Sequence, residues 1–481
     1  MNSETISGRH AQPQSGSSNA AAALGTLPLS RRQMLMRSGA GFGMLGLGSL
    51  LASEQALVGP GVASDNSSNP LAPKSPHFQP RAKRVIFLFM NGGPSHVDTF
   101  DYKPALKEKE GQPGPGGKFM PTPFKFDKYG DSGIEVSELY PHLSRQVDDL
   151  CVIRSMHTTT PNHEPGLFMM NSGAQQPIRP SLGSWLTYGL GSENQNLPGY
   201  VVLCPGKPVV GPALWGNSFL PGIYQGTHIN NAKIDPKNVI GHLNNQFLTS
   251  PQQRRMLDVM QAMNERHLAS RGQDIELEAR IASLEMAYRM QFEAQEAFDI
   301  GAETAVTRAM YGDGEFANGC LIARRLVERG VRMVQLYYGA GQPWDAHGDI
   351  MDHKRDALKS DQAIAGLLQD LKSRGMLDET LILWGGEFGR TPTAQGAKGR
   401  NHHHTGFTVW LAGGGVKGGL TYGATDEVGV HAVENRMDVH DLHATILHLM
   451  GLDHTKLTFR YSGRDFRLTD VHGTIATDIL A

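Results

Sequence analysis

The sequence is poor in the residues that would fix a fold by covalent or thiolate bonds. Only three cysteines, Cys151, Cys204 and Cys320, occur in 481 residues. Their number and spacing exclude a disulfide framework and a cysteine-based zinc site, and leave one bridge or free buried thiols. Charged residues make up 19% of the chain, with a formal net charge of −2. The lack of a basic excess argues against nucleic acid as a partner.

Long apolar runs are also scarce, and the run near the N-terminus is short. Residues 1 to about 30 are polar and Ala-rich, with too little apolar surface to fold. Arg31 and Arg32 then precede a weakly apolar run, Gly39–Ala52. A chance arginine pair before a core helix is the alternative, but the pattern is typical of a twin-arginine signal. It predicts export by the twin-arginine machinery to the periplasm or the extracellular space, with cleavage between Ala52 and Ala63.

The rest of the chain alternates between strand-like and helix-like stretches. We expect the disordered N-terminus and the signal in residues 1–60, a polar linker in 61–80, and a single domain in 81–475 with a helical insertion around 250–310. Strands are predicted at Val85–Met90, Leu150–Ile153, Tyr200–Cys204, Val331–Tyr338, Thr380–Trp384 and Phe407–Ala412, and helices at Cys320–Arg329, Ala363–Arg374 and Asp441–Met450. This order predicts an α/β fold with a mostly parallel sheet.

Metal-binding residue types follow two of these strands. Glu387 comes directly after the strand Thr380–Trp384 and its two glycines, and a loop then leads to His402, His403 and His404. Asp345 and His347 follow the strand Val331–Tyr338. Carboxylate oxygens and imidazole nitrogens are common ligands of divalent metals, and parallel strands present such residues at one edge of a sheet. A helix cap or a salt bridge would be the alternative role for Asp345.

Polar residues also follow the first two strands of the domain. Asn91, Ser95, His96 and Asp98 come after the first strand, where a plain helix cap is the alternative to a site. The sequence HTTTPNHE follows the second strand and contains Thr159, Thr160 and His163. We expect this segment to supply a nucleophile or a substrate-binding group, with a solvated polar loop as the alternative.

Several motifs resemble one protein family. FMNGGPSHVDTFD, WDAHG, GGEFGRTP and NHHHTGF, together with the twin-arginine signal, resemble an exported bacterial family, domain of unknown function 1501, within the alkaline phosphatase/sulfatase-like superfamily. The final helix, DLHATILHLMG, resembles the last helix of that superfamily. The resemblance implies a three-layer sandwich with helices on both faces of a central sheet. It also implies one or two divalent ions, such as zinc, calcium, magnesium or manganese.

The resemblance also implies roles for single residues. Asp345 and His347 match an Asp/His ligand pair, Glu387 replaces an Asp-His ligand position, and one of His402 to His404 matches a final His ligand, with His404 favoured. The superfamily's first-strand Asp is Asn91 here, unless His96 or Asp98 takes its place. The superfamily's phosphatases carry a Ser or Thr nucleophile where this chain has Thr159 and Thr160. Arg390 or Lys398 would hold the anionic oxygens of a substrate.

Together these observations predict an exported metal-dependent hydrolase of a phosphate or sulfate ester, with a small-molecule or carbohydrate ester as substrate. The Cys/Ser-x-Pro-x-Arg motif of sulfatases does not occur, which disfavours their usual chemistry. One alternative is a non-catalytic secreted protein that keeps the fold, has a degenerate site and binds or assembles with an exported protein partner. Another is redox chemistry, because sites with His and carboxylate ligands also suit iron or copper.

Overall fold

The computed structural model describes residues 69–232, 249–271, 285–286, 288–290 and 293–481. The predicted signal and residues 61–68 of the predicted linker lie outside these residues, as do parts of the predicted helical insertion. Within that insertion, α6 spans Ser250–Arg271. All described residues belong to one compact unit.

A mostly parallel sheet of nine strands forms the centre of this unit. The strand order is β14-β6-β13-β10-β1-β9-β7-β8, and β17 pairs with β6 beside this path. The strands are β1 (Arg84–Phe89), β6 (Leu150–His157), β7 (Tyr200–Leu203), β8 (Thr227–Ile229), β9 (Met333–Tyr337), β10 (Thr380–Gly385), β13 (Phe407–Ala412), β14 (Leu420–Tyr422) and β17 (Met437–Asp438). Only β13 runs antiparallel to its neighbours β10 and β6. The predicted α/β class is therefore confirmed.

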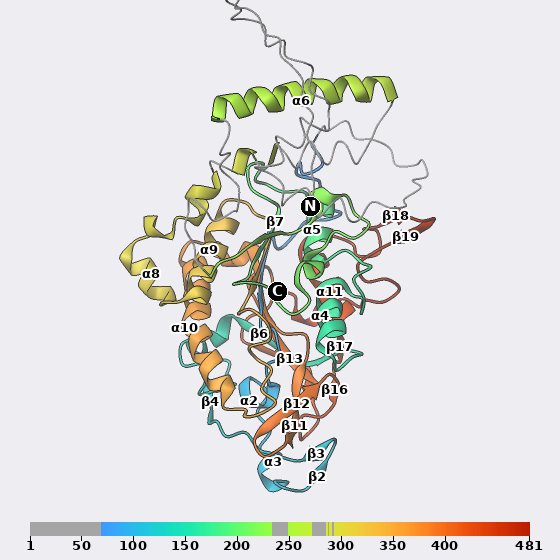
Figure 1. Cartoon of the computed structure of the whole chain (residues 1–481). Helices are drawn as coiled ribbons and strands as arrows, with labels where there is room; N and C mark the ends of the chain where they lie inside the picture. The colour runs from blue at the N-terminus through green and yellow to red at the C-terminus, as the bar shows by residue number, and fades with distance from the viewer. Residues whose placement is uncertain (1–68, 233–248, 272–284, 287, 291–292) are drawn as a thin grey trace, which may run out of the picture. The chain divides into compact units, whose positions relative to one another are not determined.

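Both faces of the sheet are covered by helices, because its strands are apolar on both sides. In β1, Ile86 and Leu88 pack into one hydrophobic core, while Val85, Phe87 and Phe89 pack into the other. Such continuously apolar strands are typical of parallel sheets. In Figure 1, one face carries α8 (Ala305–Tyr311), α9 (Glu315–Glu328) and α10 (Asp352–Ser373), and the other carries α4 (His163–Ser172), α5 (Leu182–Leu190) and α11 (Val439–Leu449). The result is a three-layer sandwich.

Two segments differ from the prediction. The sequence predicts a loop after Glu387, but this stretch forms a hairpin of β11 (Gly389–Gln395) and β12 (Gly399–His403). The hairpin turns at Gly396, whose φ of +63° is accessible to glycine without strain. Helix α10 begins at Asp352, eleven residues before the predicted start at Ala363. The sequence does not reveal these first turns because they are polar and lack the apolar periodicity of the later turns.

The described residues also form small hairpins beside the central sheet. They are β2–β3 (Pro113–Gly114, Gly117–Lys118), β4–β5 (Phe126–Tyr129, Ile134–Ser137), β15–β16 (Ala424–Thr425, Ala432–Glu434) and β18–β19 (Phe459–Tyr461, Arg464–Phe466). Two short helices, α2 (His96–Thr99) and α3 (Ala105–Glu108), follow β1. The three cysteines are free and buried. Among the helices of the described residues, none has the length and apolarity that crossing a membrane requires.

Candidate metal centre

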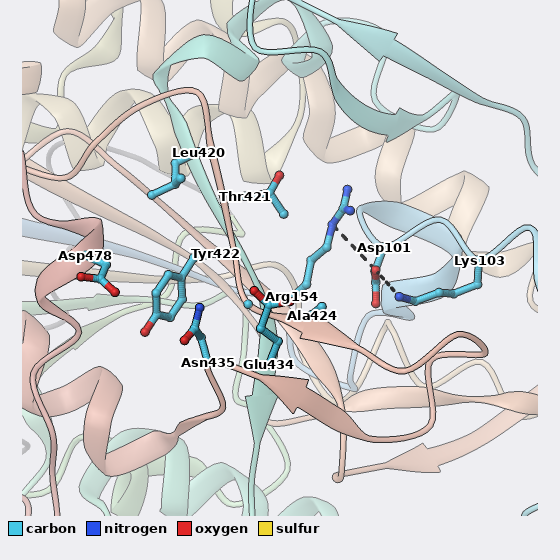
Figure 2. A pocket seen from close by; sticks show the side chains of 11 residues that line it. Asp101, Lys103, Arg154, Leu420, Thr421, Tyr422, Ala424, Glu434, Asn435 and Asp478 are labelled. Carbon is cyan, nitrogen blue, oxygen red and sulfur yellow. Dashed lines mark ion pairs between the residues drawn. The ribbon is translucent and has the colours of Figure 1, made fainter.

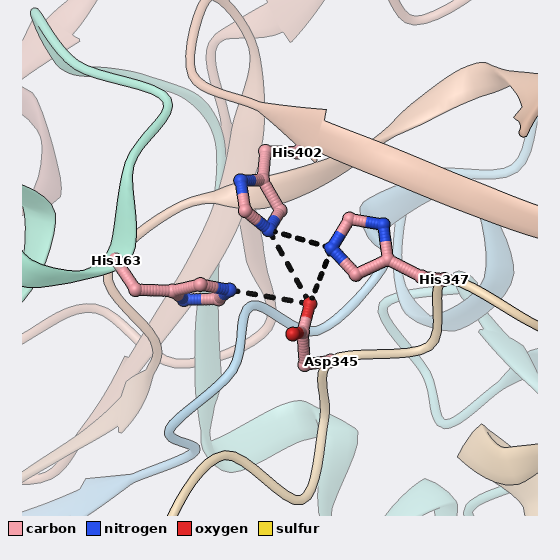
Figure 3. Close-up of side chains that lie close together, drawn as sticks. All are labelled: His163, Asp345, His347 and His402. Atoms are coloured by element: carbon pink, nitrogen blue, oxygen red, sulfur yellow. Dashed lines mark hydrogen bonds and ion pairs between the residues drawn. The ribbon is translucent and has the colours of Figure 1, made fainter. Parts of the chain in front are cut away.

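Four side chains converge at the carboxyl-terminal edge of the sheet. His163, Asp345, His347 and His402 each direct one ligand atom to a common point, and these atoms all lie within 4.8 Å of one another. We call these four residues the His/Asp cluster. The Nε2 atoms of His163, His347 and His402 lie 3.2, 3.0 and 3.3 Å from Asp345 Oδ1. Figure 3 shows the three rings arranged around this carboxylate oxygen.

Asp345 and His347 lie on the loop that follows β9, and a close approach to the loop after β1 holds them in place. The backbone N–H of Trp344 donates to the carbonyl of Asn91 at 3.2 Å. Gly92 adopts φ +115°, and a Cβ atom there would lie 2.6 Å from the backbone nitrogen of Asp345. Only glycine therefore allows the two loops to approach so closely. This close approach brings the loops after β1 and β9 together.

His402 is brought to the cluster by the hairpin β11–β12, on which it pairs with Arg390. The backbone N–H of Arg400 donates to the carbonyl of Ala346 at 3.2 Å, which fixes β12 against the Asp345 loop. A Cβ atom at Gly399 would overlap the carbonyl oxygen of His347. The strand ends at His403, so His404 lies beyond the regular alternation that directs His402 inward. The ring of His402, and not the favoured His404, joins the cluster.

His163 is the first residue of α4, and both of its ring nitrogens face carboxylates. Its Nδ1 lies 2.6 Å from Glu387 Oε1, and its Nε2 faces Asp345. Glu387 is fully buried and also accepts hydrogen bonds from the Gly92 N–H at 3.0 and 3.2 Å. Burial lowers the pKa of His163, but the contacts with Asp345 and Glu387 outweigh burial and raise it overall. A carboxylate behind a metal-ligating histidine fixes the orientation of its ring.

A buried arginine balances the charge of the cluster. The Arg390 guanidinium is fully buried and donates from Nη2 to Asp345 Oδ1 at 2.5 Å. It also donates to the carbonyl oxygens of Gly92, Gly93 and Arg400. Burial alone would raise the pKa of Asp345, but His163, His402 and Arg390 hold it far below its ordinary value. Asp345 is therefore a carboxylate throughout the physiological pH range.

The aromatic ring of Phe388 supports two of the imidazoles. Phe388 is 1% exposed, and its ring centroid lies 4.9 Å from those of both His163 and His402. The rings of His163 and His402 meet edge-on with centroids 4.2 Å apart. The third imidazole, that of His347, contacts the side-chain oxygen of Gln395 through Nδ1. Each of these contacts restricts the rotation of a ring whose other nitrogen points into the cluster.

The cluster has the donor set and the spacing that a metal ion needs. Two ligands at about 2.0–2.1 Å from a tetrahedral zinc ion are about 3.3–3.4 Å apart. The separations from Asp345 Oδ1, 3.0–3.3 Å, and the 2.9 Å between the Nε2 atoms of His347 and His402 are close to this value. The Nε2 atom of His163 is buried, and within the described residues Asp345 is the carboxylate that it faces. The four side chains therefore fit a divalent ion.

Other predicted site residues lie outside the cluster. Asn91 donates from its side-chain amide to the carbonyls of Gly339 and Gly341, and its Oδ1 is buried without a hydrogen bond among the described residues. His96 stacks on His403 with ring centroids 5.6 Å apart. Asp98 forms a fully buried ion pair with Arg400, with Nε–Oδ2 at 2.6 Å. Of the eight predicted metal ligands, Asp345, His347 and His402 are in the cluster and Glu387 contacts it.

The predicted nucleophiles and substrate-binding residues differ in their exposure. Thr159 is exposed and accepts a hydrogen bond from Gln175 at 2.8 Å, whereas Thr160 is 5% exposed and accepts one from the Asn162 N–H at 3.3 Å. The side chain of Lys398 is 73% exposed and lies 4.0 Å from Asp349. His163, predicted within the catalytic segment, is instead a member of the cluster.

Sequence reasoning missed Arg400, Gln395 and Phe388. Arg400 precedes His402 by two residues, in a polar segment predicted as a loop, and no sequence signal indicated that it is buried. Phe388 stands between the glycines of GGEFG, where one large apolar residue indicates packing beside the site. No sequence signal pointed to Gln395, because its role depends on the register of the hairpin.

Comparison with known proteins identifies one family. A single family model matches residues 82–480, and its description reads protein of unknown function (DUF1501). No protein with curated information matches the chain.

Solved structures match at low similarity. A sulfatase from Pseudoalteromonas sp. is 14% identical, with a TM-score of 0.35, and the match covers 93% of this chain and 76% of the sulfatase. A protein of the alkaline phosphatase superfamily from Vibrio parahaemolyticus is 11% identical, with a TM-score of 0.33 and coverage of 88% and 76%. An alkaline phosphatase from the Antarctic bacterium TAB5 is 10% identical, with a TM-score of 0.33 and coverage of 78% and 99%. Similarity at this level carries no argument about activity.

Proposed function

The chain belongs to the DUF1501 family of proteins of unknown function, and we propose that it is a metal-dependent hydrolase of a phosphate or sulfate ester. The observation that carries the proposal is the convergence of three imidazole nitrogens on Asp345 Oδ1 at 3.0–3.3 Å. His163, Asp345, His347 and His402 would hold one divalent ion. Such an ion polarises an ester oxygen and lowers the pKa of a bound water.

The donor set favours some metals over others. Three imidazoles with one carboxylate suit zinc or manganese, whereas calcium and magnesium prefer oxygen ligands throughout. Charge supports a dication at this position. Asp345 and Glu387 carry two negative charges against the single positive charge of Arg390, so the site is formally short of positive charge when its three histidines are neutral.

The chain's own residues would orient the ligands and hold the anionic substrate. Glu387 fixes the ring of His163, and Arg390 fixes Asp345. Because the donors of Arg390 are directed at Asp345 and three backbone carbonyls, it acts within the protein, and the exposed Lys398 is the better of the two predicted anion-binding residues. Thr160 and Thr159 remain the predicted nucleophiles. A carbohydrate ester would suit an exported enzyme.

Elemental analysis of the purified, folded protein tests the proposal. We expect about one equivalent of a transition metal, which is lost in the Asp345→Ala/His347→Ala variant while its circular dichroism is unchanged. Asp349→Ala removes an exposed carboxylate from the same loop and is the matched control, with metal content as in the wild type. Turnover of aryl phosphate and aryl sulfate esters by the metal-loaded protein would then establish hydrolysis. A folded protein without metal would refute the proposal.

A non-catalytic binding or assembly protein is the second candidate, and two observations favour it. Arg390, the buried cation nearest the cluster, is fully engaged by protein groups, and Asn91 replaces an acidic ligand with an amide that donates to backbone carbonyls. A protein that binds metal but hydrolyses no ester, and that retains an exported partner after cross-linking, would support this function. Redox activity of a coloured metal-loaded protein would instead point to iron or copper chemistry.

We also propose export by the twin-arginine pathway, which rests on the Arg31-Arg32 pair and the run after it. Replacing both arginines with lysines should leave the protein in the cytoplasm, as measured by cell fractionation. Unchanged export of the variant would contradict the proposal.

A further inference from the structure

A second polar site lies on the outer strands of the sheet, away from the residues of the cluster. It is a cavity of about 440 Å³, within the roughly 300–1,000 Å³ that is usual for small-molecule sites. Its walls come from β14, β6, the β15–β16 region and the loop after α2. We call it the Arg154 pocket, after the residue on its β6 wall. It shares no residue with the His/Asp cluster.

Arg154 has unused hydrogen-bonding capacity in this pocket. Its side chain is 16% exposed, and its Nε lies 3.7 Å from Asp101 Oδ1, which also pairs with Lys103 at 3.0 Å. Figure 2 shows the two terminal nitrogens of Arg154 turned away from Asp101. Within the described residues these nitrogens make no hydrogen bond or ion pair. A largely buried guanidinium with a free planar fork suits a carboxylate or sulfate group.

The remaining walls offer neutral and acidic hydrogen-bonding groups. The side chains of Thr421, Tyr422, Asn435, Glu434 and Asp478 line the pocket, and none makes a hydrogen bond or ion pair among the described residues. Burial, and then Asp478 and Asp441, raise the pKa of Tyr422, so its phenol stays protonated and can donate. Such a mixture of donors and acceptors matches the hydroxyl groups of a sugar.

Charge limits the ligand to one anionic group. The lining contains two cations, Lys103 and Arg154, and three acidic residues, Asp101, Glu434 and Asp478. The formal sum is therefore −1, which disfavours a polyanion, while the free fork of Arg154 favours a single negative group at one end. We propose that the Arg154 pocket binds a sugar unit that carries one anionic group, a carboxylate or a sulfate ester, with that group on Arg154.

Binding measurements on the full chain test this proposal. Isothermal titration or saturation-transfer NMR would compare glucuronate, glucose 6-sulfate, neutral glucose and inorganic sulfate. We expect the two acidic sugars to bind at least about tenfold more tightly than glucose, because only they form charge-assisted hydrogen bonds to Arg154. Glucuronate against glucose 6-sulfate shows which anionic group is preferred. Equal binding of glucose and the acidic sugars, or no binding at millimolar concentrations, would overturn the proposal.

Variants then locate the ligand. Arg154→Gln should weaken glucuronate binding at least about tenfold, whereas Arg145→Gln, which removes an exposed arginine outside the pocket, should leave it unchanged. If Arg154→Gln fails to fold, Thr421→Val and Asn435→Ala keep the charge pairs intact and should each weaken binding about threefold to tenfold. Wild-type affinity in the folded pocket variants would refute the site. Binding should persist in Asp345→Ala/His347→Ala, which separates this result from that on the metal centre.

Discussion

Two aspartate–arginine pairs use arginines of the same hairpin, Arg390 and Arg400, and differ in what surrounds the carboxylate. Asp98 and Arg400 are both fully buried, and the carboxylate receives two bonds from the guanidinium, at 2.6 and 3.2 Å, and one from the hydroxyl of Ser95. Asp345 and Arg390 share one contact at 2.5 Å, and the side chain of Asp345 is 23% exposed. Asp98 is thus satisfied by its partners alone.

The difference lies in the number of donors that meet one oxygen. Three imidazole nitrogens and one guanidinium nitrogen all approach Asp345 Oδ1, and two of the imidazole nitrogens are 2.9 Å from each other. A single oxygen has only two lone pairs with which to accept, so hydrogen bonds alone do not account for this arrangement. Two pairs of the same composition can therefore differ in role. The Asp98–Arg400 pair, which we call the closed pair, stabilises the fold, whereas the Asp345–Arg390 pair, which we call the open pair, forms part of a site.

The largest expected effect comes from breaking the closed pair. Asp98→Ala leaves Arg400 buried without its counter-charge, and we expect the free energy of unfolding to fall by about 3–5 kcal/mol. Urea denaturation followed by circular dichroism measures this loss. Asp127→Ala, an exposed aspartate, is the control and should change stability by less than about 0.5 kcal/mol. A loss as small as that of the control would show that Arg400 is held by its backbone contacts instead.

The open pair should affect metal binding more than stability. Asp345→Asn preserves the shape of the side chain and removes its charge, and we expect metal affinity to fall more than about 100-fold, beyond the 10–100-fold typical of residues behind a ligand. Competition with a chelator measures this affinity. The folded fraction of the Asp98→Asn variant should retain metal. An equal loss of metal in both variants would remove the distinction between the two pairs.

A substitution of Glu387 tests whether residues behind the His/Asp cluster affect its affinity for metal. Glu387→Gln keeps an acceptor near the Nδ1 of His163 but removes the charge, and we expect a 10–100-fold loss of metal affinity. Chelator competition is again the measurement, with Glu110→Gln as an exposed control. Unchanged affinity would mean that α4 alone orients His163.

The smallest expected effect concerns His353, which borders the closed pair. Its Nε2 accepts a hydrogen bond from the Ser95 N–H at 2.9 Å. Burial lowers the pKa of His353 to about 3. Asp98 opposes this shift, whereas Arg390, Arg400 and Arg355 add to it. The unfolded chain takes up this proton near pH 6.5 but the folded protein does not. Stability should therefore fall as the pH is lowered from 6.5 toward 3, by about 1.4 kcal/mol per pH unit from this residue.

His353→Gln should make that decrease shallower. Urea denaturation at pH 7 and pH 5.5 compares the variant with the wild type, and His472→Gln, at an exposed position, is the control. An identical pH dependence in His353→Gln and the wild type would show that folding does not lower the pKa of His353.

Local sequence patterns predicted the sheet well because its strands are buried on both faces. The runs Val85–Met90 and Thr380–Trp384 match β1 and β10 within one or two residues. The positions of Asp345, His347 and His402 near one another also followed from the strand order. The inclusion of His163 and the choice of His402 over His404 depend on where α4 begins and where β12 ends. Periodicity does not define these boundaries, so they were not predictable.

The distance between the cluster residues along the chain determines when, during synthesis, the cluster can form. His163 and His402 are 239 residues apart, and the strands β9, β10 and β1 must pair before their loops meet. At a synthesis rate of about 5–20 residues per second, His402 is made roughly 10–50 s after His163. During this interval the earlier ligand has no partner from the later segments. The cluster therefore cannot be complete before His402 has been made, and a metal ion held by all four residues would be acquired only after that point.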